Sequence, residues 1–328
     1  MHYIKLTRPV NLIFIIFIMI LFRYTFVLPG FYKVYDFSSE LSTFQFIILV
    51  LVTIFTAASG YVINDIYDSD IDLINKPDKV IIEKTIDVND AYNFYKILSL
   101  IAVLLSITLT FSTKNYGLAT VPILILVALN FYAQIFKKMF LAGNLIISLF
   151  AAMVILLPAL YESKTTLDTS KVVLDIKSGI LTAAICYAVF AFATTFLREI
   201  IKDMQDIKGD KQYNCRTIPI VLGLTKTKIL LTVISLFLLA YEFSFAIFFP
   251  SLNIKHVHLY IDIILLLPLL LIITLIWWSK TKDQFRLASG VLKIYMLIGV
   301  CTMFYFIYVS GAASYLFMQY ANFIKKIF

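Results

Sequence analysis

Charged residues, cysteine and histidine are scarce in this chain of 328 residues, and each scarcity excludes a class of protein. Only 15% of the residues are charged, well below the share usual for a soluble domain. The three cysteines, Cys186, Cys215 and Cys301, have no paired spacing among themselves or with histidine, so neither disulfides nor a zinc site is expected. The sequence has no soluble domain and no long basic run, which excludes nucleic acid as a partner.

Hydrophobic residues make up 61% of the chain, and the mean hydropathy is +0.91. A soluble core could not bury this much apolar surface, so the sequence predicts an all-α polytopic membrane protein with a single domain over residues 1–328. The first apolar stretch is too long for the hydrophobic region of a signal peptide, and we expect the chain to keep it. About nine transmembrane helices are predicted, at residues 9–28, 42–63, 92–112, 117–136, 140–161, 178–198, 226–249, 258–278 and 291–318.

Lysine and arginine are divided unevenly between the two sides of such a bundle. Eighteen lie on the side of the N-terminus, namely Lys5, Arg8, Lys76, Lys79, Lys84, Lys137, Lys138, Arg198, Lys202, Lys208, Lys211, Arg216, Lys226, Lys228, Lys280, Lys282, Arg286 and Lys293. Eight lie on the other side, namely Lys33, Lys114, Lys164, Lys171, Lys177, Lys255, Lys325 and Lys326. The more basic side of a membrane protein faces the cytoplasm. We therefore expect an integral protein of the cell (inner) membrane with a cytoplasmic N-terminus and active site. Arg23, inside the first span, is expected to extend to an interface.

Two acidic segments interrupt the hydrophobic pattern, and each follows an apolar run. The first reads NDIYDSDID over residues 64–72, and the second reads KDMQDIKGD over residues 202–210. On a helix, side chains three or four residues apart share a face, so each segment presents one polar stripe. The stripes are Asn64, Asp68 and Asp72, and Asp203, Asp206 and Asp210. Asp70 points away from its stripe and is expected to be solvated.

Oxygen ligands in this arrangement are typical of Mg²⁺, which takes one or two carboxylates from a protein and its other ligands from water and substrate phosphate. Both stripes lie on the same expected side of the membrane, each at the mouth of a span. We predict that they face each other across a site for Mg²⁺ and a polyphosphate. All six residues are candidate metal ligands, and the five aspartates are candidate catalytic residues.

Cations near these segments would bind the diphosphate oxygens that the metal leaves free. The candidates are Lys76, Lys79, Lys137, Lys138, Lys202 and Arg216. An allylic diphosphate ionises when Mg²⁺ and cations hold its leaving group in a dry site. Its apolar tail needs a tunnel that is continuous with lipid, which a bundle of helices can form. The pattern therefore predicts an enzyme that uses an isoprenyl diphosphate.

Other interpretations account for parts of this pattern. One acidic segment at a helix end is often only solvated charge, but two with matching spacing on one side favour a shared site. A cation-coupled transporter would have ionisable residues and broken helices near the middle of the membrane, where the expected spans contain almost no acid. A lipid-binding or scaffold protein derived from such an enzyme would not need the intact ligand set. Mg²⁺-dependent release of diphosphate separates an enzyme from both.

At this point the chain resembles the UbiA-type intramembrane prenyltransferases. Residues 64–72, followed by INKPD at 74–78, are similar to the first aspartate-rich motif of that family. Residues 202–210, with TIP at 217–219, are similar to the second. The likeness extends to LTRPVN at 6–11 and YAQIFKKMFLAGN at 132–144, so it covers most of the chain.

The resemblance implies nine transmembrane helices around a central cavity, cytoplasmic cap segments, a side opening to lipid and Mg²⁺-dependent transfer of an isoprenyl chain. In the matching segments, it implies that Tyr132 helps to bind the diphosphate and that Arg8, Asn11 and Asn144 line an acceptor pocket. The expected partners are an isoprenyl diphosphate, a lipophilic acceptor and membrane lipid, with no obligate protein partner.

Within the family, the run NDIYDSDIDLINKPDK is most similar to geranylgeranylglyceryl phosphate geranylgeranyltransferases, which alkylate a glycerol hydroxyl to make ether lipids. Aromatic-ring prenyltransferases of quinone synthesis share the metal motifs, and that acceptor class stays open. The chain departs from the family pattern at two places. Lys79-Val80 stands where Arg-Pro is common, and lysine cannot make a two-pronged contact to phosphate. Asn214 stands where glycine is common, and asparagine also tolerates a left-handed backbone, so we expect that turn to be retained.

Overall fold

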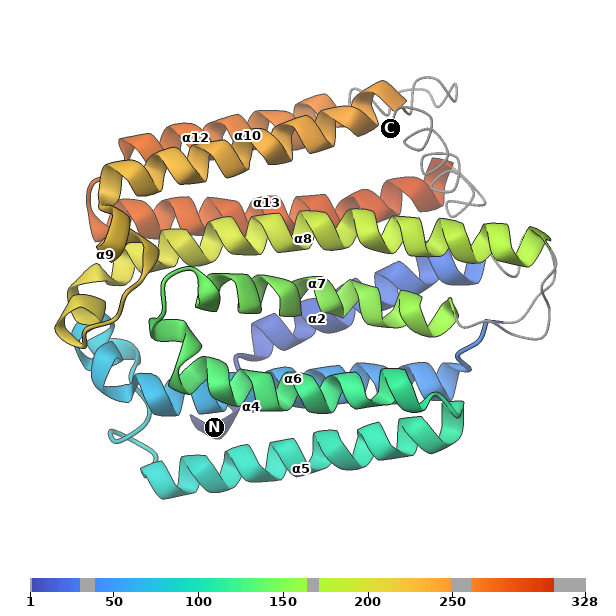
Figure 1. Cartoon of the computed structure of the whole chain (residues 1–328), viewed down its shortest axis with the longest axis horizontal. Coiled ribbons are helices and arrows are strands. Elements are labelled where there is room, and N and C mark those ends of the chain that lie inside the picture. The colour runs from blue at the N-terminus through green and yellow to red at the C-terminus, as the bar shows by residue number, and fades with distance from the viewer. Residues whose placement is uncertain (1, 30–38, 164–170, 249–260, 310–328) are drawn as a thin grey trace.

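The computed structural model describes residues 2–29, 39–163, 171–248 and 261–309. These ranges are almost entirely helical, and the long helices run along one common direction (Figure 1). The longer elements are α2 (Pro9–Phe22), α4 (Thr43–Asn75), α5 (Val88–Thr113), α6 (Tyr116–Gln134), α7 (Ala142–Glu162), α8 (Lys171–Gln212), α10 (Leu224–Phe248), α12 (Leu267–Trp278) and α13 (Lys282–Val309). The short elements are α1 (His2–Leu6), α9 (Ile218–Leu222), the 3₁₀ turns η2 (Pro77–Lys79) and η3 (Phe136–Lys138), and the π-helical turns η1 (Arg23–Val27) and η5 (Ile261–Leu266).

Polar residues fix where several of these helices begin. The Ser42 hydroxyl accepts a hydrogen bond from the Gln45 backbone amide, and the Ser42 amide donates to the Gln45 side chain. This reciprocal pair caps the start of α4. The side chains of Asp87 and Asn115 cap α5 and α6 in the same way, by accepting from backbone amides of the first turn.

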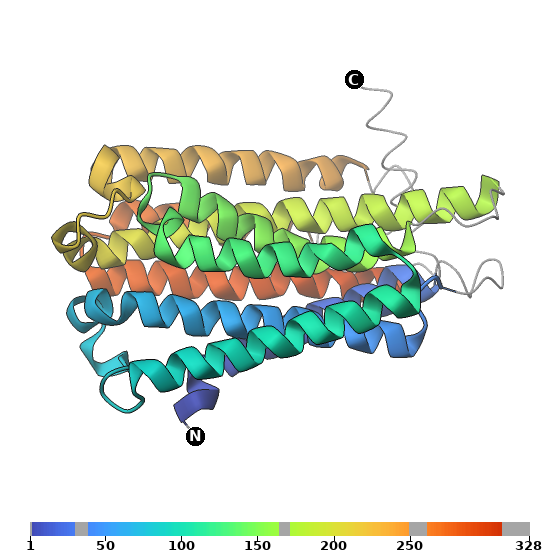
Figure 2. The ribbon, with the colours of Figure 1, turned by 60° about the horizontal axis from the view of Figure 1, so that its bottom comes forward.

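Helix α8 lies at the centre of the bundle. Two-thirds (67%) of its apolar stretch is buried inside the protein, against 22% for both α5 and α10. Figures 1 and 2 show α5 and α10 on opposite outer faces, with α8 between them. The largest buried cluster includes Ala183, Leu197 and Ile200 of α8, packed against side chains of α10, α12 and α13. α8 is therefore the element against which the rest of the site is positioned.

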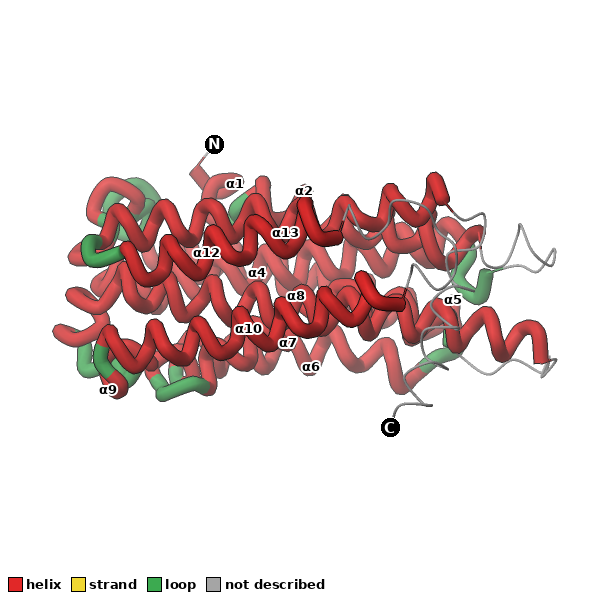
Figure 3. The backbone as a smooth tube through the Cα atoms, turned by 90° about the horizontal axis from the view of Figure 1, so that it is seen from above, coloured by secondary structure: helices red, strands yellow, loops and turns green. Residues whose placement is uncertain are grey.

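The outer helices expose apolar side chains instead of polar ones. Phe111 of α5 is 70% exposed, and Phe237 of α10 is 63% exposed. Such faces are stable in lipid, where the backbone hydrogen bonds of each helix are satisfied internally. The connections between helices gather at the two ends of the bundle (Figure 3). The protein is thus an all-α integral membrane protein, as the composition predicted.

Eight helices in the described ranges are long and apolar enough to cross a membrane, and a shorter apolar helix covers Ile263–Trp278. The shorter helix corresponds to the predicted span at 258–278, whose first residues lie partly outside the described ranges. The count of nine spans therefore stays a prediction. The predicted span at 291–318 was placed too late, because α13 already begins at Lys282; residues 310–318 lie outside the described ranges. A helix can begin in charged residues, because its backbone hydrogen bonds do not depend on hydropathy, whereas an apolar run begins only after them.

Helices α4 and α8 are longer than a bilayer requires. They contain 33 and 42 residues, which corresponds to about 50 Å and about 63 Å of helix. A hydrocarbon core is about 30 Å thick, so one end of each helix extends beyond it. Both acidic segments lie in these extensions, whereas the sequence analysis had placed them in polar segments after spans that end at residues 63 and 198. The apolar runs end near residues 63 and 198, but both helices continue beyond these positions.

Two further expectations have different outcomes. Asn214 has a backbone φ of 55°, so the left-handed turn after the second acidic segment is retained, as predicted. The expectation for Arg23 is wrong, because its side chain is buried in the protein. It donates to the Leu41 carbonyl at 2.8 Å and lies 3.7 Å from the Glu162 carboxylate. Because Glu162 of α7 is a buried acidic partner, the Arg23 guanidinium does not need to reach a membrane interface.

Candidate active site

The last turns of α4 and α8 bring the two acidic segments to the same end of the bundle (Figure 1). Their direct link is a hydrogen bond of 2.9 Å from the Gly209 backbone amide to the Asn75 side-chain oxygen. The carbonyl of Asn75 in turn accepts from Lys282 at the start of α13. Asn75 is buried, so this contact fixes how the two helix ends meet.

Gly209→Ala is expected to disturb that contact and to lower the isoprenyl transfer predicted from the sequence about a hundredfold, the loss that follows a small misplacement of reacting groups. A Cβ at position 209 would lie 2.6–2.8 Å from the side-chain amide atoms of Asn75, so Asn75 must move and its hydrogen bond is lost. The measurement is the turnover number for prenyl transfer, together with the thermal unfolding temperature. Gly117→Ala is the control, because the nearest atom to its new Cβ is 4.0 Å away. Equal turnover in both variants would contradict this role for Gly209.

The stripe on α4 is held by its own asparagine and by a lysine from another element. Asn64 donates a hydrogen bond of 2.8 Å to Asp68, as expected for residues four apart on a helix. Lys137, in the turn η3 between α6 and α7, contacts the same Asp68 oxygen and donates to the Asn64 oxygen at 3.3 Å. Asp68 is buried, and it faces a cation that is distant in the sequence.

The stripe on α8 meets the first one through Lys76. This lysine donates a hydrogen bond of 2.6 Å to Asp206, and its nitrogen lies 3.5 Å from Asp72. Lys76 also follows the last residue of α4, where a cation is favoured by the helix dipole. One ammonium group therefore joins an aspartate of each predicted stripe, and the two stripes form a single polar site.

The other two aspartates of the α8 stripe have different surroundings. Asp203 accepts a hydrogen bond of 2.8 Å from the Asn144 side chain of α7. Asp210 is buried within electrostatic reach of Asp206 and Lys137. Asn144 was predicted as an acceptor-pocket residue, and the structure places its amide on Asp203 while it also lines the cavity.

Both lysines of the site hold their protons more tightly than usual. Burial lowers the pKa of Lys76, but the carboxylates of Asp206 and Asp72 raise it by more, so it lies above the ordinary value. Burial likewise lowers the pKa of Lys137, and Asp68 more than compensates. Both groups are therefore cationic at neutral pH, which is the state that binds phosphate oxygens.

The donor set has the chemistry that Mg²⁺ requires. Carboxylate oxygens of Asp68, Asp72, Asp206 and Asp210 and the amide oxygen of Asn64 line one cavity, and all are hard ligands. One Asp206 oxygen is buried and has no hydrogen-bond partner in the described part of the chain, as expected of an oxygen available to a cation or its water. In the described part of the chain, no three acidic, cysteine or histidine side chains already converge as a complete metal centre. Lys76 and Lys137 instead contact these carboxylates.

The structure places the remaining candidate residues in different ways. Lys138, Tyr132, Arg8 and Asn11 line the same cavity. Arg8 has a left-handed backbone, forms an ion pair with Asp65 and stacks over the Tyr61 ring at 5.0 Å.

The other three candidate cations, Lys202, Arg216 and Lys79, have different surroundings. Lys202 lines the cavity but is paired with Glu199. Arg216 is exposed and contacts the site only through its backbone amide, which donates to the Lys138 carbonyl at 2.8 Å. Lys79 ends η2, and its side chain lies outside the described part of the chain. Asp70 is exposed and is not among the cavity-lining residues, as expected.

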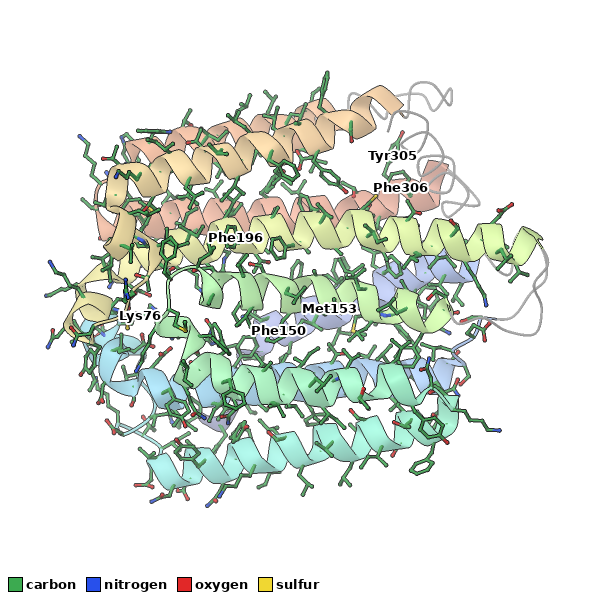
Figure 4. The ribbon with its side chains drawn as sticks, in the orientation of Figure 1. Lys76, Phe150, Met153, Phe196, Tyr305 and Phe306 are labelled. Atoms are coloured by element: carbon green, nitrogen blue, oxygen red, sulfur yellow. The ribbon has the colours of Figure 1, made fainter. Side chains whose placement is uncertain are left out.

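A cavity of about 1040 Å³ extends from this polar site into the bundle. Its lining residues on α8 run from Tyr187 to Asp210, which is about 35 Å along a helix. Farther from the aspartates most of the wall is apolar, with Phe150 and Met153 of α7 among its members. Figure 4 shows Lys76 at one end of the bundle and these two side chains farther along it. The arrangement suits a ligand with a charged head and a long apolar tail.

Several charged residues that line this cavity were not predicted as site residues from the sequence. Arg198, Glu199 and Lys293 belong to its wall, and Asp65 is the partner of Arg8. The spacing of Arg198, Glu199 and Lys202 within about one helical turn indicated a shared helical face. Their position at the end of an apolar run, however, is also typical of residues at a membrane boundary. A buried contact from Tyr295 to Glu242, between α13 and α10, was also missed, and neither residue is part of the cavity wall.

Comparison with known proteins gives the family. The model of the UbiA prenyltransferase family matches residues 26–297, which include both acidic segments and most of the cavity wall. The chain belongs to the UbiA prenyltransferase family. It shares this membership with several curated archaeal proteins named digeranylgeranylglyceryl phosphate synthase. One from Sulfurisphaera tokodaii is 30% identical over 77% of this chain and 85% of its own length. One from Sulfolobus acidocaldarius is 32% identical over 77% of this chain and 82% of its own length.

Solved structures of UbiA proteins share the fold. A structure of digeranylgeranylglyceryl phosphate synthase in membranes matches with a TM-score of 0.61 and 23% identity, over 92% of this chain and 96% of the other. A UbiA homologue from Archaeoglobus fulgidus, bound to DMAPP and Mg²⁺, matches with a TM-score of 0.57 and 16% identity, over 92% and 99% of the two chains. At these identities the match concerns the fold.

Proposed function

We propose that this UbiA prenyltransferase transfers a geranylgeranyl group from its diphosphate to the hydroxyl of geranylgeranylglyceryl phosphate, which forms an ether lipid. The observation that carries the proposal is the Lys76 bridge between Asp72 and Asp206, because it joins both acidic stripes at the polar end of a long apolar cavity. The relatives named digeranylgeranylglyceryl phosphate synthase support the choice of donor and acceptor.

The site would bind the diphosphate head and the isoprenoid tail of the donor in different parts of the cavity. Lys76, Lys137, Lys138 and Tyr132 line the cavity, and the three ammonium groups would bind diphosphate oxygens. The isoprenoid tail would occupy the apolar length of the cavity, which excludes water from the reacting carbon. Such a position prepares the allylic carbon–oxygen bond for cleavage.

Mg²⁺ fits the same end. Asn64, Asp68, Asp72, Asp206 and Asp210 would hold it, and when bound it supplies Lewis-acid stabilisation of the negative charge on the leaving diphosphate. The Archaeoglobus fulgidus homologues bound to prenyl diphosphates and Mg²⁺ support this assignment. The lysines add fixed positive charge where the leaving group forms.

The acceptor hydroxyl needs no strong base in this scheme. Once the donor ionises, the allylic cation bonds to the neutral hydroxyl oxygen, and the proton passes afterwards to the released diphosphate or to a carboxylate. Asp203, oriented by Asn144, is the carboxylate that we assign to this step. Arg8 and Asn11 would form part of the acceptor side of the cavity.

We further propose that the protein lies in the cell membrane with this site on the cytoplasmic side. The support is the distribution of eighteen lysine and arginine residues on the side of the acidic segments against eight on the other. A basic cytoplasmic face would also attract an anionic donor and anionic lipid headgroups.

The decisive experiment supplies membranes that contain the protein with labelled geranylgeranyl diphosphate and one of three acceptors. We expect a labelled product with geranylgeranylglyceryl phosphate and none with 4-hydroxybenzoate or dihydroxynaphthoate. Removal of Mg²⁺ by a chelator is expected to stop the reaction, and its return to restore it. A labelled aromatic product, with no ether lipid, would instead assign the protein to quinone synthesis. Membranes that contain the Asp206→Ala variant are the matched control for other enzymes.

A further inference from the structure

A second group of cations lines the cavity, apart from the lysines that contact the acidic stripes. It consists of Arg198 and Lys202 of α8 and Lys293 of α13, with the carboxylate of Glu199 among them; we call it the inner basic cluster. All four side chains belong to the cavity wall. The mechanism proposed above uses none of them.

The contacts within this cluster leave positive charge in excess. Both oxygens of Glu199 accept from Lys202, at 2.7 and 2.9 Å, and one lies 3.5 Å from Arg198. No ion pair joins Lys293 to a carboxylate in the described part of the chain, and its charge interacts with that of Arg198. Arg8 also lies within electrostatic reach, but Asp65 pairs with it. Asp203 lies within electrostatic reach of Glu199 and Lys202, so three cations face two carboxylates and positive charge stays in excess.

These cations line the cavity, where a charge without a partner is costly. The Nε atom of Arg198 is buried and has no hydrogen-bond partner among the described residues. A guanidinium with an unused donor, beside two ammonium groups, has the geometry that recognises phosphate oxygens. The chemistry therefore selects an anion with several oxygens.

The donor diphosphate does not meet this requirement at the inner basic cluster. Arg198 precedes Asp206 by eight residues, which is about 12 Å along α8. A diphosphate bound by Lys76 and Lys137 beside Asp206 could not also extend to Arg198. The cluster therefore suits a second anion that occupies the cavity together with the donor.

We propose that the inner basic cluster binds the phosphate monoester of the lipid acceptor. This inference rests on the proposed function and adds the residues that recognise the acceptor. A phosphate monoester carries about −1.5 to −2 charges at neutral pH, so it suits a site where cations outnumber carboxylates. Its binding there would hold the two anions apart and leave the glycerol hydroxyl between them.

The test compares acceptors with and without the phosphate. Lys293→Gln is the principal variant, because this side chain is exposed and forms no ion pair with the described residues that the change would break. We expect its KM for geranylgeranylglyceryl phosphate to rise about tenfold to a hundredfold, the effect of losing one charged hydrogen bond. Its KM for geranylgeranyl diphosphate and its turnover of the phosphate-free acceptor, geranylgeranylglycerol, should equal those of the unmodified protein. Arg198→Gln should show the same higher KM for the phosphorylated acceptor and the same unchanged values for the donor and for geranylgeranylglycerol.

Charge-keeping variants and a matched surface variant complete the experiment. Lys293→Arg and Arg198→Lys should restore most of the affinity for the phosphorylated acceptor. Lys208→Gln should change nothing, because Lys208 is exposed on the same helix as Arg198 and is not among the cavity-lining residues. A higher KM for the donor, or equal losses with both acceptors, would overturn the inference while the proposed function stands. If the unmodified protein releases diphosphate but alkylates neither glycerol acceptor, the proposed function itself is wrong.

Discussion

Asp68→Ala and Asp206→Ala are each expected to abolish prenyl transfer while the protein still folds. Both residues are candidate metal ligands at the ends of long helices, and their loss removes charge stabilisation worth several kcal/mol in the transition state. That corresponds to about a thousandfold lower kcat/KM, or more. The measurement is transfer of labelled geranylgeranyl diphosphate at saturating Mg²⁺, with thermal unfolding measured on the same samples.

Two further variants make this result interpretable. Asp68 is buried against Lys137, so Asp68→Asn, which keeps the size of the side chain, should be as inactive as Asp68→Ala with a smaller loss of stability. Asp70→Ala is the matched control from the same helix, because Asp70 is exposed and is not among the cavity-lining residues. Its turnover should be close to that of the unmodified protein. Near-normal turnover in Asp68→Ala or Asp206→Ala would rule out a shared site formed by both acidic segments.

A donor with fluorine next to the allylic carbon is expected to react more slowly by orders of magnitude. Fluorine withdraws electrons and destabilises the allylic cation, so the rate should fall if ionisation of the donor limits transfer. The described residues that line the cavity include no histidine. An acceptor hydroxyl bound there would lie near carboxylates and cations instead of a strong base. Ionisation before bond formation removes the need for such a base.

The comparison requires that the fluorinated donor binds normally. Its inhibition constant against the unmodified donor should equal the KM of the latter within a few fold, because fluorine is small and the diphosphate is unchanged. Asp203→Asn should then retain substantial activity, since released diphosphate can also accept the proton. Unchanged rates with the fluorinated donor, combined with complete loss in Asp203→Asn, would indicate direct displacement with Asp203 as general base.

Much of the site could be predicted because its information is local. The spacing of Asn64, Asp68 and Asp72 places them on one helical face in any fold, and the same holds for Asp203, Asp206 and Asp210. The apolar runs before both segments indicated membrane helices with polar ends. The left-handed turn at Asn214 also followed from the residue type.

Contacts between distant segments could not be predicted in the same way. Lys137 was one of six candidate cations, and no sequence signal paired it with Asp68, which is 69 residues away. Lys76 meets Asp206 across 130 residues, and Asn144 meets Asp203 across 59. Arg198 and Lys293 become neighbours only because α13 packs beside α8.

By itself, the sequence determined that this protein is a helical membrane protein with two polar stripes at helix ends, because helix formation and hydrophobicity depend on neighbours within a few residues. Only the tertiary structure decided how far α4 and α8 continue, which cation meets each carboxylate, and that charged residues at the end of one apolar run form the wall of a cavity. Those features depend on the distances between packed helices. Helix packing is set by the shapes of whole faces, and no single segment of the chain records it.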